Sequence, residues 1–246
     1  MNLNDAERSQ YEWQFDVEGF GESGQCKLKE ASVLVSRCGG VGGSAAWQLA
    51  AAGVGRIVLA HGGNLKPSDL NRQTLMGHEW IGKLRVEHAA ARLRAFNPHI
   101  EVETIPENLS ESNADRLVSG VDLIVDAAPL FEERFAMNHA SVKFGKPMIE
   151  CAMYAMDAYC TTFIPGVTSC LACLCPEKPI GWKRKFPVFG AVSAMIGSIA
   201  AMEAIKVLAG FGEPLLDRMM VINLRTGTCR VQKISRNPSC PICGVS

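Results

Sequence analysis

Short runs of β-branched and apolar residues alternate with longer stretches of helical periodicity from residue 30 to residue 151. The runs predict five extended segments, at 32–36, 56–60, 100–105, 121–127 and 147–151. Helices are predicted between these segments, at 44–52, 82–96, 110–117 and 131–144. Strands that alternate with helices form parallel sheets covered on both faces. The sequence therefore predicts an α/β fold with a doubly wound, mostly parallel, Rossmann-like sheet.

The pattern changes after residue 151. One long apolar helix is predicted at 188–208, and a hairpin pairs 219–222 with 229–234 across Thr226-Gly227. Because neither a repeat nor a flexible linker interrupts the chain, we expect residues 1–246 to form a single domain. Its predicted parts are an N-terminal helical segment (1–29), a first half (30–151) and a second half (152–246).

Charge and hydropathy exclude several classes of protein. The 25 Lys and Arg residues balance 25 Asp and Glu residues, so the basic surface of a nucleic-acid-binding protein is missing. The N-terminus is charged and has no apolar core, so it is not a secretory signal. The longest apolar run, 188–202, is too short to span a bilayer and continues into Glu203 and Lys206. We therefore expect a cytoplasmic protein that contacts neither nucleic acid nor membrane, with this run as a buried helix.

Two pairs of cysteines have the spacing of a metal site. Cys170 and Cys173 form one Cys-x-x-Cys pair, and Cys240 and Cys243 form another. Two such pairs complete the closed tetrahedral site typical of structural zinc, which would staple the C-terminal β elaboration to the segment near residue 170. The alternative is that these cysteines are free or disulfide-bonded. Cys175 is a spare thiol beside the first pair, and nothing in the sequence supplies it with a base.

A cluster of glycines follows the first predicted strand, in Cys38-Gly39-Gly40-Val41-Gly42-Gly43. A strand–turn–helix with such glycines lets backbone N–H groups approach a phosphate closely, which makes Gly39, Gly40 and Gly42 candidate ligand-binding residues. A dinucleotide site also needs an acid at the end of the second strand, and this strand ends in Leu59-Ala60-His61-Gly62-Gly63. A dinucleotide-dependent reductase is therefore only a weak alternative.

Further motifs give the chain a specific resemblance. In chain order they are Gly39-Gly40-Val41-Gly42, Ala52-Gly53-Val54-Gly55, Leu70-x-Arg72-Gln73, Phe96-Asn97-Pro98-His99-Ile100, the two cysteine pairs, Ile196-Gly197-Ser198, Met202-Glu203-Ala204-Ile205-Lys206 and Arg236-Asn237-Pro238. With these motifs the chain resembles the ThiF/MoeB/HesA family, the bacterial relatives of ubiquitin-activating enzymes. The resemblance extends over nearly the whole chain.

The resemblance implies a reaction and its partners. The C-terminal glycine carboxylate of a small ubiquitin-like sulfur-carrier protein attacks the α-phosphate of ATP, and pyrophosphate leaves with magnesium. Residues 30–151 would be the nucleotide-fold half, and residues 152–246 would bind the carrier tail and zinc. A homodimer is implied as well, and it would also cover the apolar long helix. At the matching positions the catalytic residues would be Arg72 and Arg85, and the pocket residues for a nucleotide or another ligand would be Gly39, Gly40, Gly42, His61, Arg72 and Gln73.

Several positions depart from the family pattern. Arg37 replaces a glycine of the loop, His61 replaces the ribose-binding acid, and Asp69 replaces an asparagine. Arg85 stands at the position of the catalytic lysine, and Pro129 at that of the magnesium-binding acid. Removing one charged group that stabilises the transition state typically costs about 3 to 4 kcal/mol, so several such changes together abolish useful turnover unless other groups replace them.

We therefore predict a protein that binds the C-terminal tail of a small carrier protein or peptide, with ATP-dependent adenylation lost or altered. The alternative is an active adenylyltransferase in which Arg37, Arg85, and Glu132 or Glu133 take over the lost roles. The sequence leaves open whether ATP and magnesium bind, and whether the altered pocket takes a different small molecule. Arg72 also has a purely structural interpretation, as the ion-pair partner of Asp69.

Overall fold

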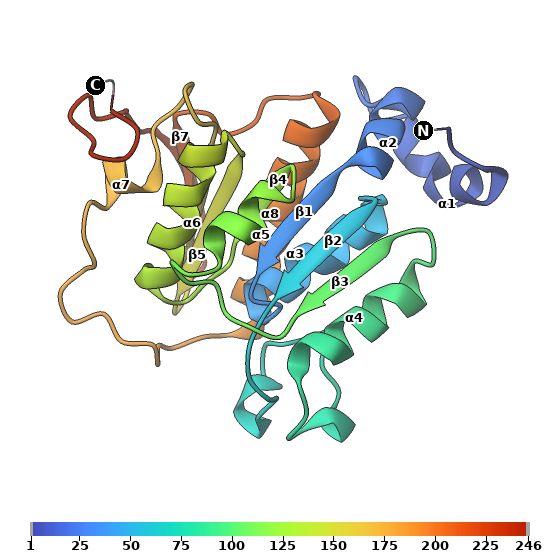
Figure 1. Cartoon of the computed structure of the whole chain (residues 1–246), viewed down its shortest axis with the longest axis horizontal. Coiled ribbons are helices and arrows are strands. Elements are labelled where there is room, and N and C mark those ends of the chain that lie inside the picture. Colours follow the sequence, from blue (N-terminus) through green and yellow to red (C-terminus); the bar gives the residue numbers. More distant parts are fainter. Residues whose placement is uncertain (1, 245–246) are drawn as a thin grey trace.

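A single sheet of eight strands runs through the molecule, in the order β3-β2-β1-β4-β5-β6-β7-β8 (Figure 1). The computed structural model describes residues 2–244. The strands are β1 (Ser32–Ser36), β2 (Arg56–Ala60), β3 (Glu101–Ile105), β4 (Leu123–Asp126), β5 (Met148–Tyr154), β6 (Asp157–Phe163), β7 (Arg218–Asn223) and β8 (Thr228–Lys233). The pairs among β1 to β5 are parallel, and β6, β7 and β8 add to the sheet in antiparallel pairs. This confirms the predicted α/β fold and its mostly parallel sheet.

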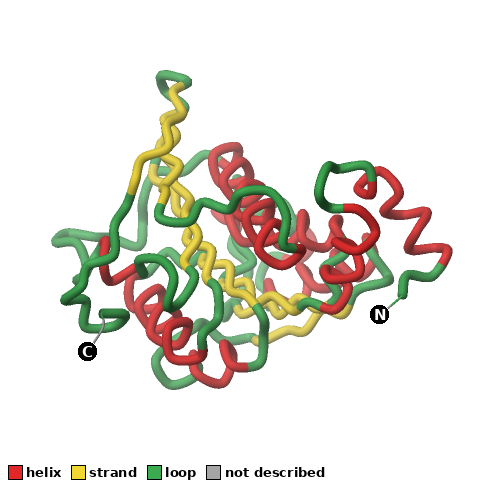
Figure 2. The backbone as a smooth tube through the Cα atoms, turned by 90° about the horizontal axis from the view of Figure 1, so that it is seen from above, coloured by secondary structure: helices red, strands yellow, loops and turns green. Residues whose placement is uncertain are grey.

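Helices cover both faces of the sheet, which Figure 2 shows nearly along its edge. They are α1 (Asp5–Phe15), α2 (Gly21–Glu30), α3 (Gly40–Ala52), α4 (Arg85–Phe96), α5 (Ala114–Ser119), α6 (Phe131–Phe144), α7 (Leu171–Leu174) and α8 (Gly190–Ala209). One core lies between the sheet and α3, α4 and α8, and a second lies between the sheet and α5 and α6. The β7–β8 hairpin extends beyond both helical layers (Figure 2).

Four helices begin at residues other than the predicted ones, among them α8, which begins at Gly190 rather than at residue 188. Helix α3 begins at Gly40 rather than at residue 44, so its first turn is made of the glycine cluster itself. Helix α4 begins at Arg85, because Gly82 adopts a left-handed conformation with φ +86° and ends the preceding turn. Helix α5 begins at Ala114 rather than at residue 110, because the Asn113 side chain accepts from Ser110 N at 2.9 Å and closes a turn before the helix.

Helix α8 is the buried helix that the apolar run predicts. Val192, Ile196 and Ala200 are among its buried residues, and it packs closely on α3 at Gly197, where an added Cβ would lie 2.3 Å from the Val41 carbonyl oxygen. Among the described residues, it is also the one helix whose length and hydropathy would suit a membrane span. Its buried Glu203 accepts hydrogen bonds from Thr162 Oγ1 at 2.9 Å and Leu215 N at 2.7 Å, which ties the helix into the protein core.

The sheet reverses its winding direction between β1 and β4. Strand β1 is followed by the glycine cluster and α3 on one face, and β4 is followed by residues 127–130 and α6 on the other face. Neighbouring connections that leave in opposite directions open a crevice at the carboxyl ends of the strands, where α/β proteins bind their ligands. The fold therefore places a ligand pocket directly after the glycine cluster.

Candidate functional site

A pocket with about 820 Å³ of empty space, including open solvent at its mouth, lies at the carboxyl ends of β1, β2 and β4. Of the predicted pocket residues, it brings together Gly39, Gly40, His61, Arg72 and Gln73, and it adds Arg85, which was predicted as a catalytic residue. Gly42 does not line it. That residue packs in the first turn of α3, where an added Cβ would lie 2.0 Å from the Arg37 carbonyl oxygen. Gly42 therefore serves the close approach of helix and strand, and the lining glycines are Gly39 and Gly40.

Arg37 occupies the turn between β1 and the glycine cluster with φ +70°, a left-handed conformation that a glycine would adopt without strain. Its side chain is buried and faces Glu133 of α6, to which Nε donates at 2.8 Å and Nη2 donates as well. The pair is bidentate, the strongest geometry for an arginine and a carboxylate. Glu133 is thus committed to Arg37.

His61 at the end of β2 is held on both sides of its ring. Its Nε2 accepts from Arg85 Nη1 at 3.0 Å, and its Nδ1 lies 3.5 Å from Cys38 Sγ. Because arginine only donates, Nε2 carries no proton. Burial, and then the charges of Arg37 and Arg85, lower the pKa of His61 to about 2. Burial also raises the pKa of Cys38 to about 12. His61 is therefore a neutral, fully engaged side chain.

Asp69 joins the two arginines that the sequence singles out. Its carboxylate accepts from Arg85 Nη2 at 3.0 Å, from Arg72 Nη2 at 3.2 Å and from Lys66 N at 3.0 Å. Arg72 is thus an ion-pair partner of Asp69, as its structural interpretation predicts. Two polar atoms of this group are buried without a partner, namely Arg85 Nε and Gln73 Oε1. Unsatisfied buried polar atoms are costly, so they mark a place where a ligand or water completes the hydrogen bonding.

A buried charge network of Asp126, Arg134 and Glu150 lies beside the pocket, and no motif in the sequence predicts it. Asp126 and Glu150 are directly paired in the register of β4 and β5, and neither is exposed. Arg134 of α6 lies 3.8 Å from Asp126 Oδ2, donates to Glu150, and donates from Nε to the Ala128 carbonyl oxygen at 2.8 Å. Burial raises the pKa of Glu150 well above its usual value, Arg134 opposes the rise, and Asp126 adds to it. The signal available in the sequence was two acids inside apolar strand runs, since buried acids need partners.

The segment 175–189 between α7 and α8, named here the connecting loop, supplies four of the residues that line the pocket, namely Trp182, Arg184, Phe186 and Val188. Trp182 Nε1 donates to the Pro129 carbonyl oxygen at 3.0 Å, and its ring packs edge-on to Phe131 at 5.2 Å between centroids. The loop therefore supplies an aromatic roof and one cation.

A mainly apolar groove continues from the pocket under this roof. It has about 660 Å³ of empty space, including open solvent, and its lining includes Phe131, Ala152, Met153, Tyr154, Trp182 and Met219. Four residues line both the groove and the pocket, namely Arg134, Ala152, Met153 and Trp182. The two cavities thus meet beside Arg134.

The pocket does not fit the magnesium ion that the resemblance implies. Magnesium prefers oxygen ligands, chiefly carboxylates. Among the described residues that line the pocket, Asp69 is the one acid, and Arg72 and Arg85 occupy it. Pro129 has no side-chain oxygen, and Asp126 is fully buried beside Arg134. Glu132 is exposed and pairs with Lys178. No step of the chemistry is derived through this ion.

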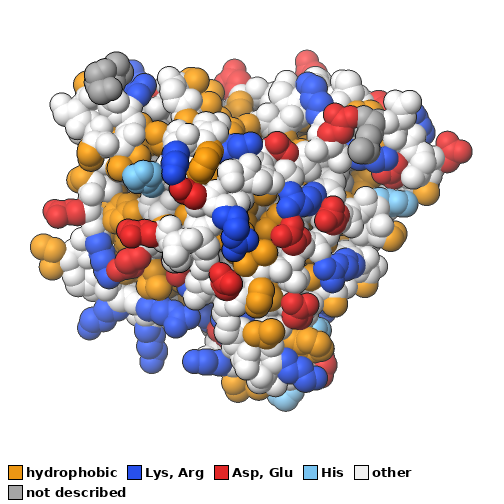
Figure 3. Space-filling model, viewed as in Figure 1, with side chains coloured by type: hydrophobic (Ala, Val, Ile, Leu, Met, Phe, Trp, Pro, Cys, Tyr) orange, Lys and Arg blue, Asp and Glu red, His pale blue; other side chains and the backbone are white. Residues whose placement is uncertain are grey.

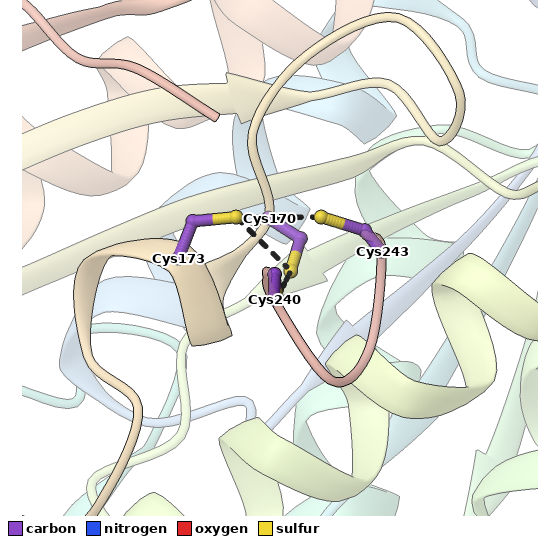
Figure 4. Close-up of side chains that lie close together, drawn as sticks. All are labelled: Cys170, Cys173, Cys240 and Cys243. Atoms are coloured by element: carbon purple, nitrogen blue, oxygen red, sulfur yellow. Dashed lines mark hydrogen bonds between the residues drawn. The ribbon is translucent and has the colours of Figure 1, made fainter. Parts of the chain in front are cut away.

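The four predicted cysteines come together at the C-terminal end of the chain (Figure 4). Cys170 directly precedes α7, and Cys173 lies within that helix. Cys240 and Cys243 lie on the terminal loop. Their sulfur atoms all lie within 4.8 Å of one another. The sulfur atoms of three pairs lie 4.0, 3.8 and 3.3 Å apart. Two sulfur ligands of a tetrahedral zinc ion would lie about 3.8 Å apart. The cluster can hold one metal ion.

Neighbouring groups position the sulfurs of the cluster. Asn138 Nδ2 donates to Cys170 Sγ at 3.6 Å, and Asn237 N donates to Cys173 Sγ at 3.4 Å. Burial raises the pKa of Cys240, but hydrogen bonds from the backbone of Cys243 and Ile242 outweigh it and lower the pKa to about 7. Burial raises the pKa of Cys243 and that of Cys170, so of these three thiols Cys240 loses its proton first. Outer hydrogen bonds of this kind orient the ligands of metal sites.

Comparisons with known proteins agree with this fold. Residues 11–242 match the model of the ThiF family. The heterocyst protein HesA of Trichormus variabilis is 46% identical over 99% of this chain and 91% of its own length. The sulfur carrier protein adenylyltransferase of Thermus thermophilus is 35% identical over 99% of this chain and 93% of its own length. The crystal structure of E. coli MccB with ATP superposes with a TM-score of 0.86, at 26% identity over 98% of this chain and 75% of that one.

Proposed function

Because the chain belongs to the ThiF family, we propose that it binds the C-terminal tail of a small ubiquitin-like carrier protein, with the magnesium-assisted adenylation of its relatives lost or altered. Its relatives include a sulfur carrier protein adenylyltransferase, which supports a carrier protein as the partner. The observation that carries the proposal is the junction of the apolar groove with the arginine-lined pocket beside Arg134.

The groove suits an extended peptide. Its walls are mainly apolar and aromatic, and Trp182 of the connecting loop roofs it. A tail laid in the groove would bring its last residue to the pocket, where Arg72, Arg85 and Arg184 attract a carboxylate or a phosphate. The pocket residues Gly39, Gly40, His61, Arg72, Gln73 and Arg85 are the proposed ligand contacts. We assign Gly42 to the packing of α3.

The positions of the charged side chains in the pocket support a loss or change of the adenylation reaction. Magnesium has no free acid among the pocket-lining residues that the structure describes, and a neutral His61 stands at the ribose-binding position. Without each such stabilising group the activation barrier rises by about 3 to 4 kcal/mol, which lowers the rate by a factor of about a hundred or more.

An active adenylyltransferase is the second candidate. Arg72 and Arg85 converge on the pocket, and MccB, of similar fold, has been crystallised with ATP. Its weakness is that Glu133 is committed to Arg37 and Glu132 to Lys178, so neither replaces the missing acid. A dinucleotide-dependent reductase has less support, because both ring nitrogens of His61 are engaged within the protein.

Three wider features complete the proposal. The metal of the cysteine cluster is structural zinc, supported by four thiol ligands at near-tetrahedral spacing. The chain acts as a single cytoplasmic domain, residues 1–246, with the nucleotide-fold half at 30–151 and the tail-binding and zinc half at 152–246. It works as a homodimer, for which light scattering at micromolar concentration must give twice the 26.6 kDa of one chain.

The test pairs peptide binding with adenylation. A peptide of about ten residues ending in a free glycine carboxylate should bind, and the same peptide with an amidated end should bind more weakly. Tyr154→Ala should weaken binding because Tyr154 lines the groove and is half exposed, whereas Val231→Ala, equally exposed on β8, should not. ATP–pyrophosphate exchange should stay at background. Exchange that depends on peptide would establish the adenylyltransferase instead, and equal binding of the two peptides would contradict the proposal.

A further inference from the structure

Five arginines line the pocket, and four of them have acidic partners. Arg37 pairs with Glu133, Arg134 with Glu150, and Arg72 and Arg85 share Asp69. Within the described part of the chain, Arg184 has no such partner. Its charge still reaches the pocket interior, since it is one of the causes that lower the pKa of His61. Arg184 is therefore the cation that a ligand can use without breaking an existing ion pair.

The connecting loop carries three neighbouring basic residues, and one of them faces the pocket. Lys183, Arg184 and Lys185 are all exposed, but Arg184 alone of the three lines the cavity. Figure 3 shows Lys and Arg side chains gathered along the lower edge of the molecule, where Figure 1 places this loop. The two lysines therefore offer matched controls for the charge of Arg184.

The pocket interior also holds groups that await a partner. Arg85 Nε is a buried donor and Gln73 Oε1 is a buried acceptor, both without a hydrogen bond. Their residues are 5% and 4% exposed. Helix α3, 13 residues long, points its N-terminus into the same space at Gly39 and Gly40, with no side chain that caps it. Free donors at a helix N-terminus bind anions, and phosphate in particular.

We propose that this pocket binds the phosphate groups of a nucleotide without a divalent metal ion, and that Arg184, Arg85 and Arg72 carry the charge that a metal would otherwise supply. Arg72 and Arg85 come from the segment after β2 and from α4, and Arg184 lines the same pocket from the connecting loop. Arginine suits this role because its planar guanidinium donates two parallel hydrogen bonds to phosphate oxygens. The inference rests on the pocket that the proposed function assigns to an anionic group, and it is independent of the apolar groove.

The first experiment titrates the full-length protein with ATP by calorimetry, once with EDTA and once with excess magnesium. The affinity in EDTA should equal or exceed the affinity in magnesium, because metal-free ATP presents its full charge to the three arginines. Inorganic triphosphate in EDTA should displace the ATP, since the proposed contacts are to phosphate. ATP that binds only when magnesium is present, or that binds in neither condition, overturns the inference.

The second experiment removes the charge of Arg184. Arg184→Gln should weaken ATP binding in EDTA about tenfold or more, the usual effect of one charge-assisted hydrogen bond. Lys183→Gln and Lys185→Gln should each change the affinity by less than about twofold, because neither lysine lines the pocket. Equal losses in all three variants would show general attraction by the loop and overturn the role of Arg184.

The outcomes separate this inference from the proposed function. If ATP binds only with magnesium while the glycine-ended peptide still binds the groove, the inference fails and tail binding stands. If ATP binds in EDTA and Arg184→Gln weakens it, but the peptide does not bind, the inference stands and the proposed partner is wrong.

Discussion

The cysteine cluster and the arginine pocket arrange polar groups in opposite ways. The cluster brings four thiol groups close together, so that each sulfur lies near the other three. The pocket instead pairs most of its cations with acids, and it leaves Arg184, Arg85 Nε and Gln73 Oε1 unused. A closed set of ligands stabilises the fold, whereas an incomplete set is available to a ligand. Changes at the cluster should therefore act on stability, and changes at the pocket should act on binding.

The largest expected effect is at the cluster. Cys170→Ser or Cys240→Ser should abolish metal binding and lower the free energy of unfolding by several kcal/mol, because metal binding is folding free energy at such sites. Elemental analysis and denaturant unfolding measure the two effects. Cys229→Ser is the control, since Cys229 is exposed on β8 and away from the cluster. A wild-type protein purified without zinc would remove the contrast between the two regions.

A large stability effect is also expected at one pocket residue, Arg134, because it is buried between two acids. Arg134→Met should lower the free energy of unfolding by about 3–5 kcal/mol, since Asp126 and Glu150 lose their cation. Urea unfolding measures the loss. The same substitution in an Asp126→Asn, Glu150→Gln background should cost much less, as no charge is then left unpaired. An equal cost in both backgrounds would mean that packing alone explains it.

His61 should make the free energy of unfolding depend on pH, an effect of the pocket that the cysteine cluster does not share. Its pKa is about 6.5 when unfolded and about 2 when folded, so the unfolded state binds more protons between these values. Stability should therefore rise with pH over that window and lose about 1.4 kcal/mol for each pH unit below 6.5. Unfolding at about pH 5.5 and about pH 7.5 should show this loss in the wild type and a smaller one in His61→Gln. His139→Gln, at an exposed position of α6, should behave like the wild type.

The smallest effect is expected at Glu132. Its pair with Lys178 is exposed, so Glu132→Gln should change the free energy of unfolding by less than about 0.5 kcal/mol. It should also leave ATP affinity the same with and without magnesium. A variant that loses affinity only in magnesium would identify Glu132 as a metal ligand, as the active-enzyme alternative requires.

Local patterns were sufficient to predict the parallel strands, the C-terminal hairpin and the cluster, but they did not locate β6, which joins the hairpin to the rest of the sheet. Strands are recognised by short apolar runs and helices by apolar residues at the helical period, and either pattern is complete within about a dozen residues. Each cysteine pair is likewise complete within four residues, at 170–173 and 240–243. Helix starts were less accurate, because Gly40 and Asn113 are decided by contacts and turns that helical periodicity does not contain.

The charged groups of the pocket could not be predicted in the same way. Arg37 and Glu133 lie 96 residues apart, and their pairing depends on how β1 and α6 meet. Asp126 and Glu150 become neighbours only through the register of β4 with β5. The position of Arg184 depends on the path of the connecting loop, which has no periodicity to follow. Contacts of this kind require the folded sheet, so the sequence identified the pocket's place but not its charge balance.

The connecting loop is fixed at both ends, since it leaves α7 beside Cys173 and enters α8 at Gly190. Because both ends of the loop are fixed, the loop loses little conformational entropy when its central residues contact a ligand. Each doubling of a free loop adds about 0.6 kcal/mol of closure entropy. Releasing the cysteines would add the stretch before Cys173 to the mobile length. We therefore expect a metal ion at the cluster to influence the pocket through chain entropy, by limiting the conformations of the loop that carries Trp182 and Arg184.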